Sequence, residues 1–301
     1  MRRRIALAVT ALVVWVTGSA LGTASAPVAQ ALPRFALGLA HPAQAFPVLD
    51  GKKPIFILAL GSDARPGEPI ARERSDSIHI IGLNPAKKKA SILGLPRDSW
   101  VSIPGHGSDK INAAMSAGGP ELTIKTIEAL TGIHIDFYVL TSFRGLKEAI
   151  DAVGGVTVNV LQPMHDHFSG ADFDPGPVHM NGRDALAFSR DRHDFSNGDF
   201  SRSENQGRLF LATLTEFRKD FAKDPGVLLT YIGAGMRNVQ TDLSLQEVLK
   251  LGFTASQVPT NAVKNQVVPG TTGNVGDKSV VFISGSAKAI YANMKDDGLI
   301  N

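Results

Sequence analysis

The amino-acid sequence predicts an α/β protein of the α+β type: one domain in which helices pack on a mixed central β-sheet, preceded by an N-terminal signal or anchor helix. Short apolar runs bounded by turn residues indicate strands. Longer segments with apolar residues at helical spacing indicate helices, and the two kinds of segment alternate along the chain. The 301 residues, of which 43% are hydrophobic, suffice for one large domain or two small ones.

The first 26 residues have the pattern of an export signal. Arg2, Arg3 and Arg4 precede an apolar run over residues 5–22, which is about long enough to span a bilayer. Ala24-Ser25-Ala26 resembles a signal-peptide cleavage site. We therefore expect either a signal peptide that is removed or an uncleaved single-pass anchor with its arginines inside. Both place the rest of the chain outside the cytoplasm, at the membrane or secreted.

A linker and one domain are expected after this segment. Residues 27–51 are rich in Ala, Pro and Leu, lack strong periodicity and are predicted to form the linker. The domain is predicted to cover residues 52–301.

The domain is expected to begin with three neighbouring strands, at residues 55–60, 77–83 and 90–95. A polar loop over residues 64–75 joins the first two, and a turn that begins at Asn84-Pro85 makes the second and third a hairpin.

Helices and strands alternate in the remainder of the chain. Glycine and proline breaks, a Ser142 cap and apolar periodicity predict the following order: helix 119–130, strand 135–140, helix 143–152, strand 156–160, loop 162–180, helix 181–188, helix 202–221, helices 225–236 and 244–256, and strand 280–283.

The composition argues against nucleic-acid binding and excludes any role that depends on cysteine. Four arginines precede the first acidic residue, Asp50, so the +3 charge of the whole chain becomes −1 over residues 35–301. A near-neutral domain argues against a protein that binds nucleic acid through a basic face. The absence of cysteine excludes disulfides, thiolate metal sites and cysteine nucleophiles.

Acidic and basic residues cluster at the ends of the first three predicted strands. Asp63 follows the first strand, Asp76 precedes the second and Arg97 follows the third, so an antiparallel meander would bring them to one edge of the sheet. Two carboxylates suit Mg²⁺, whose other ligands are usually water and phosphate oxygens. The same residues also fit a simpler arrangement, in which both acids cap turns or pair with Arg65 and Arg74 at the surface.

A second group of basic residues lies later in the chain. Arg190 and Arg192 are at i and i+2, which puts them on one face of an extended segment. Arg202 and Gln206 are at i and i+4 on a predicted helix, and Lys110 is a further candidate phosphate donor. Converging guanidiniums suit a pyrophosphate, which accepts bidentate contacts. The alternative is a solvated face whose arginines pair with nearby acids.

Histidines and phenylalanines give weaker signals. His165 and His167 lie near acids, but a polar loop is favoured over a metal site because no helical metal-binding spacing is present. Five phenylalanines fit either an ordinary core or a lipid tunnel: Phe137, Phe143, Phe210, Phe217 and Phe253.

The ordered set of motifs resembles the LytR-CpsA-Psr family of cell-wall glycopolymer ligases, over about residues 52–222. The resemblance rests on Gly61-Ser62-Asp63, Arg74-Ser75-Asp76, Leu95-Pro96-Arg97-Asp98, Lys110-Ile111-Asn112-Ala113-Ala114, Asp151-Ala152-Val153-Gly154-Gly155-Val156, Asn181-Gly182-Arg183-Asp184-Ala185-Leu186, Arg190-Asp191-Arg192 and residues 199–206. Each motif is common alone, whereas the ordered set is specific.

The resemblance implies a membrane-anchored extracytoplasmic enzyme. It would transfer a phosphoglycan from a polyprenyl-pyrophosphate carrier to a peptidoglycan hydroxyl, commonly the muramic acid 6-OH. It implies Mg²⁺ (or Mn²⁺ in its place) on Asp63 and Asp76, and no nucleic-acid partner. The implied pyrophosphate ligands are Arg74, Arg190, Arg192, Arg202 and Gln206, with Arg65 and Lys110 as secondary candidates. Arg97 would lie beside the reacting phosphate, with Asp98 either orienting Arg97 or acting as a base.

One residue departs from the family pattern. Asn205 stands where many members carry an arginine, which would remove one phosphate donor. Two other functions would need a similar pocket: a phosphatase or pyrophosphatase acting on the same lipid, and a non-catalytic lipid-glycan receptor or regulator.

Overall fold

The structure, a computed structural model, describes residues 51–301 except residues 66, 196 and 197. The predicted signal or anchor and all of the predicted linker except Gly51 lie outside the described residues. Within the described part of the chain, no helix combines the length and hydropathy required to cross a membrane.

Three antiparallel strands form the centre of a six-stranded sheet. β1 (Ile55–Ser62) pairs with β2 (Ser75–Asn84), and β2 pairs with β3 (Lys89–Gly94). The predicted meander is therefore confirmed, and the end of β1 meets the start of β2 at Ser62 and Ser75.

Three further strands make the sheet mixed. β6 (Phe137–Ser142) runs parallel to β1, and β10 (Val263–Val267) runs parallel to β3. The short β9 (Val239–Thr241) closes the other edge against β6, which gives the order β10-β3-β2-β1-β6-β9. β9 and β10 were not predicted from the sequence, because both are short and β10 is largely polar.

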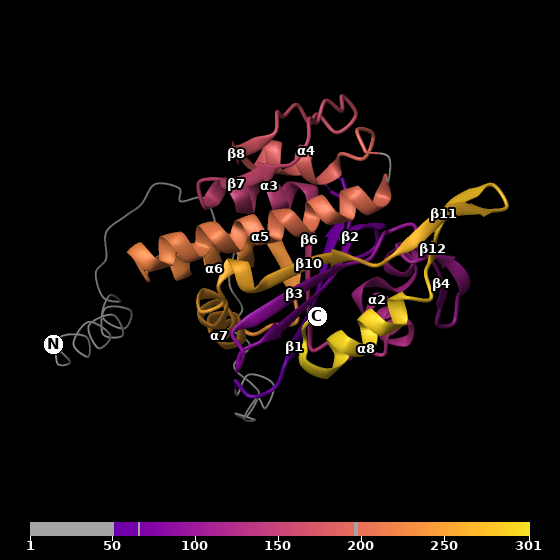
Figure 1. Cartoon of the computed structure of the whole chain (residues 1–301), viewed down its shortest axis with the longest axis horizontal. Coiled ribbons are helices and arrows are strands. Elements are labelled where there is room, and N and C mark those ends of the chain that lie inside the picture. Colours follow the sequence, from indigo (N-terminus) through magenta and orange to yellow (C-terminus); the bar gives the residue numbers. More distant parts are fainter. Residues whose placement is uncertain (1–50, 66, 196–197) are drawn as a thin grey trace, which may run out of the picture. The chain divides into compact units, whose positions relative to one another are not determined.

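Three two-stranded ribbons lie outside the main sheet: β4 (Trp100–Ile103) with β5 (Gly107–Lys110), β7 (Val156–Val160) with β8 (Gly176–Met180), and β11 (Gly270–Val275) with β12 (Lys278–Ile283). The predicted loop over residues 162–180 is therefore wrong at its end, where β8 pairs with β7. In Figure 1 the β11–β12 ribbon extends beyond the sheet.

Three of the helices on one side of the sheet begin at side-chain caps. Ser142 accepts a hydrogen bond from the Gly145 amide, 3.1 Å away, and starts α3 (Phe143–Ala152). Asn181 caps α4 (Gly182–Arg190) in the same way. The long α5 (Asp199–Lys223) crosses β2, β3 and β10 (Figure 1). The remaining helices on this side are α6 (Val227–Asn238) and α7 (Leu245–Ser256), the latter begun by a capping box and followed by a short 3₁₀ helix at Thr260–Ala262.

Two helices cover the opposite face of the sheet. α2 (Ala113–Thr131) is interrupted at Gly118 and Gly119, so the predicted start of a helix near Gly119 corresponds to its second half. α8 (Ala287–Asp297), which was not predicted, packs beside α2.

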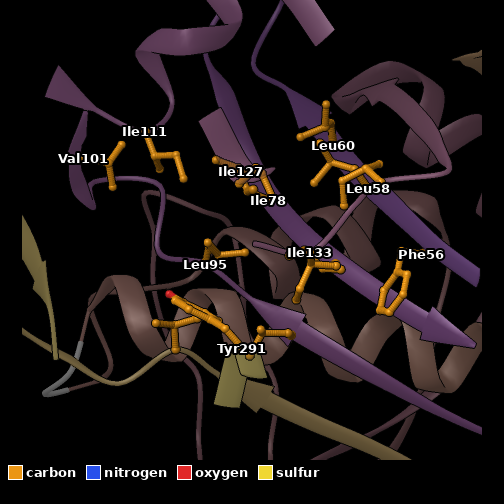
Figure 2. Packing of buried hydrophobic residues seen from close by; sticks show 14 of the residues in the cluster. Phe56, Leu58, Leu60, Ile78, Leu95, Val101, Ile111, Ile127, Ile133 and Tyr291 are labelled. Atoms are coloured by element: carbon orange, nitrogen blue, oxygen red, sulfur yellow. The ribbon is translucent and has the colours of Figure 1, made fainter. Parts of the chain in front are cut away.

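The two faces of the sheet are packed differently. Phe56, Leu58 and Leu60 of β1 point into a dense core with α2 and α8, which Figure 2 shows together with Ile127 and Tyr291. The alternate β1 residues face the α5 side, where Ile57 and Ala59 line apolar cavities instead. The face beneath α5 is therefore the one with room for a ligand.

Candidate functional site

The three strand-end motifs do meet at one edge of the sheet. The Asp63 amide donates to the Arg74 carbonyl, 3.1 Å away, as β1 ends and β2 begins. The Leu95 amide donates to the Ile78 carbonyl at 2.9 Å, which brings the end of β3 to the same edge. There the Arg97 guanidinium donates a hydrogen bond to the Asp76 carboxylate. The arrangement expected from strand order is confirmed.

Arg97 lies in an acidic and largely buried environment. Its side chain is 21% exposed and that of Asp76 is 12% exposed. Burial alone would lower the pKa of Arg97, but the charges of Asp76, Asp98 and Asp199 outweigh it and raise the pKa. The buried Nε of Arg97 has no hydrogen-bond partner among the described residues. Arg97 is thus held as a cation with one donor unused.

The surroundings of Asp63 disfavour its negative charge. Burial, followed by the charge of Asp76, raises the pKa of Asp63, and the nearby Arg97 only partly offsets this. A cation bound at the pair would relieve the repulsion, and two carboxylates are a donor set that Mg²⁺ takes.

A charged pocket of about 370 Å³ opens beside Asp76 and Arg97. Four of the predicted phosphate-site arginines line it: Arg97, Arg190, Arg192 and Arg202. The structure thus brings together arginines from three separate parts of the chain.

Arg190 reaches the pocket differently from the sequence interpretation. It is the last residue of α4 and lies over the Phe143 ring, 5.0 Å from its centroid, so the extended i, i+2 arrangement with Arg192 is wrong. The intervening Asp191 is fully buried. Its carboxylate accepts from the amides of His193 and Asp194, at 3.1 and 3.5 Å, and so fixes the turn that carries Arg192.

Arg202 and Gln206 share one face of α5, as predicted. Arg202 is almost completely buried and pairs with Asp199. The Gln206 amide donates to the carbonyls of Asp76 and Ser189, at 3.2 and 3.3 Å. Since both of its amide hydrogens are used, Gln206 ties β2 to the end of α4 here, and its contact with phosphate stays a prediction.

The lining of the pocket does not include the predicted residues Asp63, Arg65, Arg74, Asp98 and Lys110. Arg65 and Arg74 are exposed. Lys110 pairs with Asp98, 3.1 Å away, and the Asp98 amide donates to Asp199. Asp98 therefore links Lys110 of β5 to the start of α5.

The sequence interpretation missed part of the pocket wall. Asp166, Phe168, Ser169 and His193 line it. Asp166 is buried and lies 3.0 Å from His193 Nδ1. Although burial opposes it, hydrogen bonds from His193, Phe168 and Ser169 lower the pKa of Asp166 to about 2. No sequence motif predicts this wall, because Asp166 and His193 are 27 residues apart and match no known spacing.

His165, which the sequence analysis placed near acids, is exposed and pairs with Asp172 at 2.8 Å. Within the described ranges, no three His, Asp or Glu side chains converge as a metal site.

An apolar cavity of about 300 Å³ adjoins the charged pocket. The two share Asp76 and Arg190, and the cavity continues between β1, β6, α3 and α5. A second apolar cavity of about 380 Å³ shares Phe210 and Thr213 with the first and reaches α6 and α7. Of the five phenylalanines considered for a tunnel, Phe143, Phe210 and Phe217 line these cavities.

The fold is that of a known family of α/β domains. The chain belongs to the LytR_cpsA_psr family, whose profile matches residues 36–296. The structure of Bacillus subtilis TagV is similar, with a TM-score of 0.68, 29% identity, and coverage of 81% of this chain and 96% of that one. The Streptococcus agalactiae protein gbs0355 has a TM-score of 0.73 over 82% of this chain and 89% of its own; at 24% identity it shows the fold alone.

Curated relatives carry transferase names. The chain is 36% identical over 207 residues to TagU of Oceanobacillus iheyensis, a polyisoprenyl-teichoic acid–peptidoglycan teichoic acid transferase, covering 66% of this chain and 62% of the relative. It is 34% identical over 228 residues to TagV of Bacillus subtilis, which has the same activity in its name, covering 70% and 57%. The chain thus spans about three fifths of the length of these relatives.

Proposed function

We propose that the chain is a phosphotransferase that moves a phosphoglycan from a polyprenyl-pyrophosphate carrier to a peptidoglycan hydroxyl, such as the muramic acid 6-OH. The observation that carries the proposal is the shared wall of Asp76 and Arg190 between the charged pocket and the apolar cavity. A polyprenyl pyrophosphate has an anionic head joined directly to a long apolar chain, so it needs these two environments side by side. The transferase names of the relatives support the same class of substrate.

The arginines would perform most of the chemistry. Phosphoryl transfer depends on positioning and on stabilisation of charge at the transferring phosphate. Arg190, Arg192 and Arg202 would hold the pyrophosphate oxygens by bidentate contacts, and Arg97 would contact the reacting phosphate. The apolar cavities would hold the prenyl chain and keep the breaking bond in one orientation.

Asp98 would act by positioning. Its carboxylate already pairs with Lys110, and its charge is one of those that hold Arg97 as a cation. We therefore assign it to the orientation of Arg97 rather than to proton transfer. Direct phosphate contacts of Arg65, Arg74, Lys110 and Gln206 stay predictions.

Asp63 and Asp76 would hold Mg²⁺, or Mn²⁺ in its place. Burial and then the charge of Asp76 raise the pKa of Asp63, and a divalent cation at the two carboxylates would offset both effects. When bound, the metal would neutralise negative charge on the pyrophosphate.

The location of the enzyme is part of the proposal. The basic and apolar pattern of residues 1–26 would anchor or export the chain, so that the domain acts outside the cytoplasm at the membrane, where lipid-linked glycans meet peptidoglycan.

The test is to incubate the full-length protein with a polyprenyl-pyrophosphoryl glycan, Mg²⁺ and peptidoglycan oligomers, and to measure products by mass spectrometry. The proposal predicts phosphoglycan covalently attached to peptidoglycan, together with polyprenyl phosphate. Free phosphoglycan without coupling to peptidoglycan would contradict the transferase function and indicate a hydrolase. Binding of the lipid-linked glycan without turnover would contradict the transferase function and indicate a receptor.

A further inference from the structure

A second polar pocket, of about 480 Å³, lies behind the charged pocket. We call it the Asn205 pocket. It is formed by the end of β7 and the segment after it, by Asp194 and Phe195, and by the first turns of α5. Its lining includes Leu161, Gln162, Asp194, Glu204, Asn205 and Arg208. The volume is in the usual range for sites that bind small molecules.

An unused hydrogen-bond donor lies in the wall of this pocket. Asn205 is 6% exposed, and its buried Nδ2 has no hydrogen-bond partner among the described residues. An unpaired buried amide is unfavourable unless a ligand or water completes it. Asn205 does not line the charged pocket. Asparagine instead of the family's arginine at this position therefore leaves the four arginines of the charged pocket unchanged.

The charges of the two pockets differ in sign. The charged pocket has four arginines against two aspartates. In the Asn205 pocket, Asp194 and Glu204 face one cation, Arg208, and that cation is already paired with Glu204. Such a site disfavours a phosphate but accepts hydrogen bonds from hydroxyl and amide groups.

Apolar surface accompanies the polar groups. Leu161 is 60% exposed at the pocket, and Phe195 and the buried Met164 also line it. A ligand that presents an apolar face together with hydroxyl and amide groups fits this combination. A pyranose ring with an N-acetyl group has these features.

The two pockets lie back to back. Along the chain, His193 lines the charged pocket and the next residue, Asp194, lines the Asn205 pocket. At the start of α5, Ser201 lines the Asn205 pocket and the next residue, Arg202, lines the charged pocket. The walls of the two pockets are therefore built in part from the same two segments, residues 193–194 and 201–202.

We propose that the Asn205 pocket is a sugar subsite that takes an uncharged, N-acetylated pyranose and uses Asn205 to recognise it. The sugar belongs either to the acceptor glycan or to the donor glycan. That assignment rests on the proposed transferase function, whereas sugar binding itself does not.

Calorimetric titration of the full-length protein with chitotriose, a neutral N-acetylglucosamine trimer, tests the subsite. Asn205→Leu keeps the side-chain size and removes the amide, so the affinity should fall about threefold to tenfold, the usual effect of one neutral hydrogen bond. Gln162→Ala, a change at the exposed rim, should also weaken binding. Asn274→Leu, the same substitution at an exposed position on β11, is the matched control and should bind as wild type does. Thermal melting verifies that each variant folds.

Steady-state transfer kinetics then identify the source of the sugar. A higher KM for peptidoglycan oligomers in Asn205→Leu assigns the subsite to the acceptor, and a higher KM for the lipid-linked glycan assigns it to the donor. Absence of chitotriose binding in the wild type, or equal affinities in the wild type and both pocket variants, overturns the subsite. Chitotriose binding that depends on Asn205, without transfer by the wild type, keeps the subsite and rejects the transferase.

Discussion

Replacing Arg97 by alanine removes the guanidinium that pairs with Asp76 at the mouth of the charged pocket. Two effects are expected. The transferring phosphate loses a charge-stabilising contact, and Asp76 loses its counter-charge while Asp63 stays nearby. The first effect acts on the rate of transfer, and the second acts on the stability of the fold.

The magnitudes of the two effects follow from the geometry. Loss of one preorganised donor to a developing anion typically lowers kcat about 10²–10³-fold, or about 3–4 kcal/mol. The Arg97–Asp76 pair is mostly buried, with side chains 21% and 12% exposed. Its loss should therefore cost about 1–2 kcal/mol of unfolding free energy, between the values for exposed pairs and for fully buried pairs.

The assay measures kcat for glycan transfer and the unfolding free energy of the same preparations. Arg97→Lys keeps a charge without the bidentate geometry, and we expect a kcat between those of alanine and wild type. Arg144→Ala, which removes an exposed arginine paired with Glu148, should leave both quantities unchanged. A wild-type kcat in a folded Arg97→Ala variant would refute the role assigned to Arg97.

Three further predictions concern other parts of the site. Thr213 lines both apolar cavities, and Thr213→Trp should fill the space between them. The KM should then rise for a donor with a long prenyl chain but not for a short-chain analogue. Equal changes in KM for the two donors would contradict a continuous tunnel. Asp63→Asn should raise the Mg²⁺ concentration needed for half-maximal activity. In the absence of metal it should raise the Tm, because it removes a partly buried charge and the repulsion of that charge with Asp76. An unchanged Mg²⁺ requirement would exclude Asp63 from the cation site. Burial and the charge of Asp194 raise the pKa of Asp191 to about 6. Between about pH 4 and 6 the folded state therefore binds more protons than the unfolded state, and the free energy of unfolding falls as the pH rises through that window. Asp191→Asn should therefore gain in Tm relative to wild type from pH 4 to pH 7, and a constant difference across this range would show that Asp191 titrates normally.

Elements with a strong apolar pattern were predictable from the sequence. The first three strands, the Ser142-capped helix and the long helix α5 lie within a few residues of their predicted positions. Their apolar periodicity and caps are local properties, so they can be recognised without knowledge of the fold. The meander of those strands was enough to place Asp63, Asp76 and Arg97 at one edge of the sheet.

Elements that depend on distant partners were not predictable. β9 and β10 form because β6 and β3 offer unpaired edges to short segments about 100 or more residues away in the chain. The extended conformation expected for Arg190 failed because α4 continues to that residue. The wall made by Asp166 and His193 depends on a contact across 27 residues.

The sequence by itself determined which residues carry charge, where the central strands begin and end, and the resemblance to one family. The tertiary structure decided which of those residues face one another. It placed four arginines around one pocket, left Arg65 and Arg74 outside that wall, used the Gln206 amide to join β2 to α4, and directed Asn205 to a separate pocket. The physical reason is that strand periodicity and helix caps are encoded within a few residues, whereas the direction of each side chain relative to a pocket depends on how distant elements pack against it.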